Sequence, residues 1–203
     1  MGTEPLTAGV DEVGRGALFG PVVAAAVILS PRGAAQLIQE GVKDSKQLRP
    51  RQRDLLYEII KLHAIDYRIG WASARTIDRI NILQASLLAM RRAVERLVPQ
   101  PSFCWVDGNQ RIPHLTMEQQ TLIQGDRLNP AIAAASIMAK VWRDRLMVRL
   151  DRRYPGYGIA SHKGYGSRLH QQALHELGPC SQHRLSFAPC QRVLKLKGIG
   201  FES

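Results

Sequence analysis

The chain has 203 residues, of which 28 are Lys or Arg and 17 are Asp or Glu, so its formal net charge is +11. Hydrophobic residues make up 45% of the chain, which is enough for a sizeable core and excludes general disorder. A folded protein this basic is typical of one that binds a polyanion, either a nucleic acid or an anionic membrane surface, and a strongly basic partner is disfavoured.

The first half of the chain predicts an α/β pattern that opens with two paired strands. Residues 6–10 and 21–29 are apolar and β-branched, with Gly14, Gly16 and Gly20 between them. The next expected elements are, in order, a short helix near 33–41, a polar loop over 43–48, a helix that opens at Pro50, a strand over 64–71 and a helix over about 82–97.

The second half adds two short strands and the longest helical pattern in the chain. Residues 103–106 predict a buried strand, and residues 122–123 a short one. A helix is expected from 130 to 154, and beyond it only loops and short helices. We therefore expect an α/β catalytic core over 1–153 and a C-terminal loop and helical substrate-binding extension over 154–203, both within one structural unit.

Cysteine usage favours a reducing compartment, and hydropathy argues against a targeting segment. The three cysteines are an odd number without C-x-x-C spacing, which argues against a disulfide framework and a zinc ribbon. The apolar run over 17–29 is too short to span a bilayer and is preceded by acidic residues, so it is not read as a targeting segment. We expect a cytoplasmic protein with no membrane partner.

Four acidic residues follow predicted strands: Asp11 and Glu12 the first, Asp107 the fourth and Asp126 the fifth. Two unit charges about 4 Å apart repel by roughly 4 kcal/mol at an effective dielectric near 20, so a carboxylate cluster needs a compensating cation. Oxygen ligands without a nearby His favour Mg²⁺ or Mn²⁺ over zinc. Such a cluster within a basic protein suits phosphodiester cleavage. Taken singly, each residue could also be a helix cap or turn former.

Several motifs resemble those of the ribonuclease HII family, in the expected order. The most specific is Val-Asp-Glu-Val-Gly-Arg-Gly at 10–16, followed by Gly-Pro-Val-Val-Ala-Ala-Ala at 20–26. The others are Asp44-Ser45-Lys46, Asp107-Gly108-Asn109, Gly125-Asp126, the apolar run 132–141, Arg143-Asp144, Tyr157-Gly158, His162-Lys163-Gly164-Tyr165-Gly166 and the stretch His183–Phe187. The ordered set is far more specific than any one motif.

The resemblance implies a ribonuclease H-like fold, in which a mixed central sheet is flanked by helices and followed by a C-terminal helical extension. It also implies an endonuclease that cleaves the RNA strand of RNA–DNA hybrids. Such an enzyme incises 5′ to ribonucleotides embedded in duplex DNA, as in ribonucleotide excision repair. The implied chemistry is two-metal-ion hydrolysis with Mn²⁺ or Mg²⁺ that leaves a 3′-hydroxyl and a 5′-phosphate. A monomer is expected.

The same resemblance assigns roles to individual residues. It implies that the metal-binding, catalytic carboxylates are Asp11, Glu12, Asp107 and Asp126. Gly14, Arg15 and Gly16 would present backbone amides and a guanidinium to the ribonucleotide and its 2′-hydroxyl. Ser45 and Lys46 would contact phosphate, and Tyr165 would pack on the sugar at the RNA–DNA junction. Ser136 and Lys140 are expected to pack and orient the long helix, and His162 and His183 to be structural or close to phosphate.

Two alternatives stay open at this point. A ribonuclease HIII shares the fold, but it carries an extra N-terminal domain and usually has Glu where this chain has Asp126. A non-catalytic hybrid-binding module would explain the charge equally well, but it would not need all four carboxylates. The sequence also departs from the family at Ala17-Leu18-Phe19 and at Gln124, neither of which removes a catalytic group.

Overall fold

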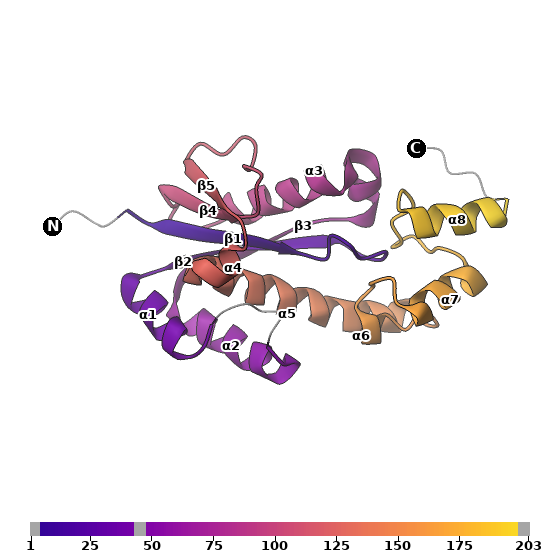
Figure 1. The fold of residues 1–203 in the computed structure, drawn as a ribbon, viewed down its shortest axis with the longest axis horizontal. Helices are drawn as coiled ribbons and strands as arrows, with labels where there is room; N and C mark the ends of the chain where they lie inside the picture. The colour runs from indigo at the N-terminus through magenta and orange to yellow at the C-terminus, as the bar shows by residue number, and fades with distance from the viewer. Residues whose placement is uncertain (1–4, 43–47, 199–203) are drawn as a thin grey trace. The chain divides into compact units, whose positions relative to one another are not determined.

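The computed structural model describes residues 5–42 and 48–198, and Figure 1 shows the fold. The chain forms two compact units that are interleaved along the sequence. The first comprises the residues up to Val13, Val23–Trp71 and Leu87–Val141, and the second Gly14–Val22, Ala72–Ser86 and the residues from Trp142 onward. Residues 154–203 belong wholly to the second unit, and the boundary placed at residue 153 stays a prediction.

A mixed sheet is the centre of the first unit. In the described residues it has five strands in the order β3-β2-β1-β4-β5. Their bounds are β1 Thr7–Val13, β2 Val22–Leu29, β3 Ala64–Ala72, β4 Phe103–Asp107 and β5 Glu118–Leu122. β1 is antiparallel to β2 and parallel to β4, and β4 is parallel to β5. The expected mixed sheet is therefore confirmed.

Helices cover both faces of this sheet. α1 (Pro31–Gln39), α2 (Pro50–His63) and the first part of α5 (Pro130–Arg153) lie on one side of it (Figure 1). Their apolar stripes bury Leu37, Ile60 and Met138 against Ala25 and Val27 of β2. On the opposite face, Gly70 of β3 lies against Ala89 and Ala93 of α3 (Ala74–Val94). The core therefore has three layers, as is usual for a sheet whose central strands are apolar on both faces.

The second unit is mostly helical. It contains the end of α5, α6 (Ile159–His162), α7 (Arg168–Leu177) and α8 (Ala188–Leu196), and Figure 1 shows these in orange and yellow. Its apolar clusters include Phe19 with Met147 and Tyr157, and Leu18 with Leu174. The short helices expected after residue 154 are confirmed.

Three sequence expectations about element bounds need correction. β1 does not end before the acidic pair, because the ladder continues from Asp11↔Ala25 and Glu12↔Ala24 to Val13↔Val23. β5 is the polar segment Glu118–Leu122, since an edge strand pairs on one side only and leaves its side chains half-exposed. Ile123, expected in that strand, lies beyond it and is 69% exposed.

The helix expected from residue 82 is the second part of a broken helix. α3 begins at Ala74, and Asn81 interrupts it with a φ of 64°. The Asn81 side chain then caps the second part by accepting a hydrogen bond of 3.0 Å from the Gln84 amide. The apolar spacing located the second part because it carries the longer apolar stripe.

One close approach joins β1 to α5 within the first unit. A side-chain carbon on Gly9 would lie 2.2 Å from the Ala131 carbonyl carbon and 2.3 Å from the Ile132 nitrogen. Both neighbours are backbone atoms at the start of a long helix, so neither can move aside cheaply. Gly9 thus lets α5 approach the strand that carries Asp11.

We expect Gly9→Ala to lower the free energy of unfolding by at least about 2 kcal/mol, because the added methyl group forces β1 and α5 apart. Urea unfolding followed by circular dichroism measures the change. An unfolding midpoint equal to that of the wild type would contradict this account of the strand–helix contact.

Candidate active site

Parallel pairing of β1 and β4 brings two carboxylates together. Val10 is the register partner of Val106, so Asp11 and Asp107 each stand one residue further along neighbouring strands. Strands in a sheet lie about 4.8 Å apart, and residues in equivalent positions of a parallel pair point to the same face. Asp11 and Asp107 therefore face the same side of the sheet, directly after the last register pair of β1 and β4.

Asp11 is the buried centre of this group, with 6% of its surface exposed. Burial raises the pKa of its carboxyl well above the ordinary value, and the charges of Glu12 and Asp107 raise it further. Hydrogen bonds from the Ser136 hydroxyl and from the Glu12 amide, the latter 2.6 Å long, act in the opposite direction and lower the pKa. Ser136 of α5 thus contacts the carboxylate directly, a role that the sequence analysis did not give it.

Asp126 reaches the neighbourhood through a different element. It is buried in the first turn of the short helix α4 (Gly125–Leu128), not at the end of a strand as expected. The amide of the preceding Gly125 donates a hydrogen bond of 2.7 Å to Asp107 Oδ1. This bond ties α4 to the end of β4, so the backbone positions of Asp107 and Asp126 depend on each other.

The donor chemistry of these residues suits a hard divalent cation. They offer only oxygen atoms, and a cation bound among them would offset the burial and like-charge repulsion that disfavour the ionised form of Asp11. Within residues 5–42 and 48–198, no three His, Cys, Asp or Glu side chains stand in an arrangement that could hold an ion as they are.

Two buried arginines hold the segment Gly14–Pro21, which includes the Gly14–Gly16 turn and belongs to the second unit. Arg184 donates to the carbonyl oxygens of Gly14 (2.7 Å), Arg15 (2.6 Å) and Gly20 (3.0 Å). Arg143 donates to those of Phe19, Pro21 and Lys163. Both arginines are fully buried, so their guanidinium groups have replaced water with backbone carbonyls.

Gly14 has the one backbone conformation in this turn that requires glycine. Its φ is +88°, and a side-chain carbon there would lie 2.2 Å from Arg143 Nε. Arg15 and Gly16 are exposed, and nothing stands within 4 Å of the place where a Gly16 side chain would begin. A ligand can therefore approach the Gly16 backbone closely.

Asp78 is a further residue that the sequence analysis missed. Its carboxylate accepts hydrogen bonds from the amides of Leu185 and Ser186 and from the Ser186 hydroxyl. Burial and the charge of Arg143 lower the pKa of Arg184 to about 9, whereas Asp78 raises it, so Arg184 stays charged at neutral pH. Arg184 also stacks over the ring of Phe187, 5.2 Å from its centroid.

Tyr165 lies against the same arginine-held segment. It forms an isolated backbone bridge with Ala17, and the Arg143 guanidinium lies 5.5 Å from the centroid of its ring. Of the residues proposed from sequence, the structure groups Asp11, Glu12 and Asp107 in the first unit. In the second unit it groups the Gly14–Gly16 turn with Tyr165 through Arg143. Ser45 and Lys46 lie outside the described residues.

The sheet order and the carboxylates on its two central parallel strands define a ribonuclease H-like nucleic-acid hydrolase. Ribonuclease H2 from Pyrococcus horikoshii superposes with a TM-score of 0.79 at 26% identity, over 94% of this chain and 98% of that one. The ribonuclease HII in a PCNA complex from Archaeoglobus fulgidus gives 0.77 at 28% identity, over 90% and 95%. The ribonuclease H-like fold is thereby confirmed.

Sequence comparison identifies the family. The ribonuclease HII profile matches residues 8–190. Ribonuclease HII of Acaryochloris marina is 64% identical over 92% of this chain and 94% of its own length, and that of Microcystis aeruginosa is 58% identical over 96% and 93%. The chain belongs to the ribonuclease HII family, and it is therefore a metal-dependent endoribonuclease that acts on RNA–DNA hybrids. In the described part of the chain, no helix is long and apolar enough to cross a membrane.

We expect Arg184→Lys to lower the free energy of unfolding by about 2–4 kcal/mol. A single ammonium cannot replace the three guanidinium bonds to the carbonyl oxygens of Gly14, Arg15 and Gly20, and buried carbonyl oxygens are left without donors. Denaturant unfolding measures the loss. The matched control Arg192→Lys lies at an exposed position of α8 and should leave stability unchanged. Equal stability of both variants would show that the buried guanidinium group of Arg184 does not hold the turn.

Proposed function

We propose that this protein incises duplex DNA on the 5′ side of embedded ribonucleotides, in addition to cutting RNA–DNA hybrids, by two-metal-ion hydrolysis. The observation that carries the proposal is the crowding of the buried Asp11 by Glu12 and Asp107. Carboxylates with no need of a cation are rarely buried together, because each raises the cost of ionising the others. We propose Mn²⁺ or Mg²⁺ as the cation, a monomeric enzyme and a cytoplasmic location.

The proposed reaction is an in-line hydrolysis. A water oxygen forms a bond to the phosphorus while the bond from the phosphorus to the 3′ oxygen breaks. That oxygen leaves with a proton as a 3′-hydroxyl, and the ribonucleotide keeps a 5′-phosphate. When bound, the two cations would activate the water and neutralise the leaving oxygen.

The chain's own residues have two tasks in this scheme. Asp11, Glu12, Asp107 and Asp126 would hold the cations, with the Ser136 hydroxyl orienting Asp11. The Gly125–Asp107 hydrogen bond would hold helix α4, which carries Asp126, against the end of β4, which carries Asp107. The net charge of +11 would bind the phosphate backbone regardless of base sequence.

Discrimination between RNA and DNA is assigned to the second unit. The open approach to Gly16 and the exposed side chain of Arg15 suit recognition of a 2′-hydroxyl, which acts as both donor and acceptor. Tyr165 offers an aromatic face to the neighbouring deoxyribose. The motif positions of these residues support this assignment, as do the buried arginines Arg184, which donates to the Gly14 carbonyl, and Arg143, which lies over the Tyr165 ring.

We expect Asp107→Asn to lower the cleavage rate by at least about a thousandfold, because an amide is a poorer ligand for a divalent cation and carries no charge. Binding of the substrate should change little. The measurement is cleavage of a duplex with a single ribonucleotide in Mn²⁺ or Mg²⁺, with binding of the same duplex followed by fluorescence anisotropy.

The matched control is Asp151→Asn, a carboxylate of α5 in the second unit, which should cleave like the wild type. A wild-type protein that binds the duplex tightly and leaves it intact would instead favour a non-catalytic binding module. An all-DNA duplex that is cut as fast as the ribonucleotide-containing one would remove the requirement for the 2′-hydroxyl.

We expect Tyr165→Ala to reduce cleavage at a single embedded ribonucleotide roughly tenfold more than cleavage of a long hybrid, since only the former places deoxyribose beside the scissile position. Comparison of kcat/KM for both substrates measures the ratio. Tyr165→Phe keeps the ring and should keep the ratio. An equal loss on both substrates would argue against recognition of the junction.

A further inference from the structure

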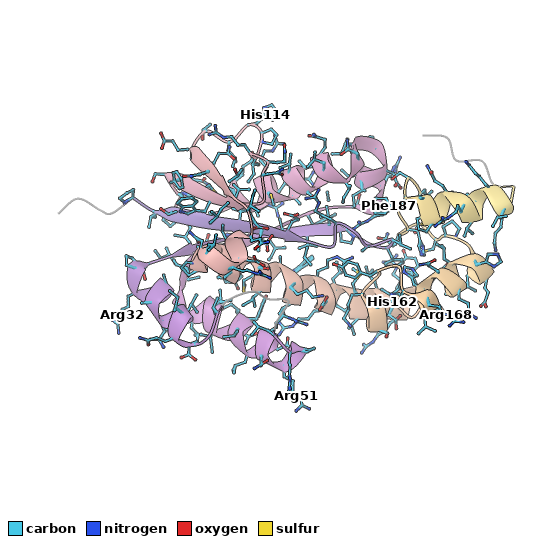
Figure 2. The ribbon with its side chains drawn as sticks, viewed as in Figure 1. Arg32, Arg51, His114, His162, Arg168 and Phe187 are labelled. Atoms are coloured by element: carbon cyan, nitrogen blue, oxygen red, sulfur yellow. The ribbon has the colours of Figure 1, made fainter. Side chains whose placement is uncertain are left out.

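Three histidines of the second unit form an array that the proposed reaction does not use. His162 lies on α6 (Figure 2), His170 on α7, and His183 directly before Arg184. His170 is fully buried and His183 is 1% exposed. The rings of His162 and His170 stack with centroids 4.4 Å apart, and Nε2 of His170 lies 3.2 Å from Nε2 of His183.

Backbone groups at both ends determine which ring nitrogens carry protons. The Cys180 amide donates to His183 Nδ1 at 3.0 Å, so this nitrogen accepts and the proton of the neutral ring is on Nε2. At the other end, His170 Nδ1 lies 2.9 Å from the Tyr165 carbonyl oxygen, which can only accept, so the proton of this ring is on Nδ1. His170 Nε2 is then an acceptor and receives the proton of His183 Nε2.

The tautomers of His183 and His170 are each determined by a separate backbone group, and they are compatible where the two rings meet. A donor nitrogen faces an acceptor nitrogen, so the hydrogen bonds run in one direction from the Cys180 amide to the Tyr165 carbonyl. His162 has an equally defined form, because the Gly164 amide donates to its Nδ1 at 3.2 Å and its Nε2 lies 2.9 Å from the Tyr157 carbonyl oxygen. Every ring nitrogen of the array therefore has a partner.

Two of these bonds reach the segment that presents Tyr165. His170 binds the carbonyl of Tyr165 and His162 binds the amide of Gly164, the residue before it. Gly164 in turn accepts a hydrogen bond of 2.8 Å from the Leu18 amide, next to the Ala17–Tyr165 bridge. The array thus determines the backbone position from which the Tyr165 ring projects.

We propose that His162, His170 and His183 are positioning residues, which hold Tyr165 for the RNA–DNA junction through one defined set of neutral tautomers. The inference rests on the proposed role of Tyr165. Acting through the backbone rather than on the phosphate, the array should affect the choice between substrates more than the cleavage step.

Burial supports the neutral forms. It lowers the pKa of His183 to about 3, and it also lowers the pKa of His170, so neither ring carries a second proton near neutral pH. A second proton on His170 would set two N–H groups against each other across the 3.2 Å contact, and a second proton on His183 Nδ1 would face the Cys180 amide at 3.0 Å. The rings also pack as apolar surfaces, with His183 edge-on to Phe19 at 5.1 Å, which a merely structural role would explain equally well.

The variants that separate the two roles are His170→Leu and His170→Asn. Leucine fills the space without a donor, whereas the asparagine amide nitrogen occupies the place of Nδ1 and can donate to the Tyr165 carbonyl. We expect His170→Leu to reduce kcat/KM at a single ribonucleotide about fivefold more than on a long hybrid, as the loss of one hydrogen bond would. His170→Asn should restore the ratio.

The controls are His175→Leu, an exposed histidine of the same helix, and the double variant Tyr165→Ala with His170→Leu. His175→Leu should leave the ratio unchanged, and the double variant should match Tyr165→Ala alone. If Tyr165→Ala shifts the ratio and His170→Leu lowers both activities equally, the positioning role is overturned while the proposed role of Tyr165 stands. If Tyr165→Ala itself leaves the ratio unchanged, both are overturned.

A measurement on the wild type keeps the inference testable even where a variant fails to fold. Nitrogen-15 NMR of histidine-labelled protein at pH 7 should show protons on Nε2 of His162 and His183 and on Nδ1 of His170. A doubly protonated ring at any of the three, or His170 carrying its proton on Nε2, would overturn the array.

Discussion

Repulsion between the buried carboxylate of Asp11 and its acidic neighbours is the constraint on which the first unit is built. Asp11 lies on a central strand, beside Glu12 and one strand away from Asp107. Its carboxylate is buried and therefore has little contact with water. The fold concentrates negative charge there and lowers its cost with neutral donors, the Ser136 hydroxyl and the Gly125 and Glu12 amides. Neutral donors orient carboxylates without neutralising them, so the charge remains available to a cation.

The second unit buries positive rather than negative charge, and it too uses neutral polar groups as partners of that charge. Two buried guanidinium groups are solvated by carbonyl oxygens of the segment Gly14–Pro21, so backbone dipoles serve as their main partners. These carbonyl oxygens carry no net charge, so they do not repel the phosphate backbone of a substrate as acidic side chains would.

Local patterns predicted most of the fold, and contacts distant in sequence account for what they missed. Apolar runs located β1, β2, β4 and the long helix α5, because each buries a continuous face. β5 was misplaced since an edge strand has no such face, and Asp126 was assigned to a strand end for that reason. The partnership of Ser136 with Asp11 and that of Arg184 with the Gly14 turn depend on how distant segments meet, which periodicity does not encode.

The hydrogen bond from Arg184 to Gly14 spans 170 positions of the chain. During synthesis the Gly14–Gly16 segment leaves the ribosome near the beginning, but the guanidinium that holds it emerges close to the end. Loop closure over such a length precedes any gain from the contact, so the turn is completed late in folding. A nascent chain therefore carries its acidic residues long before it can complete the turn for which we propose a role in substrate selection.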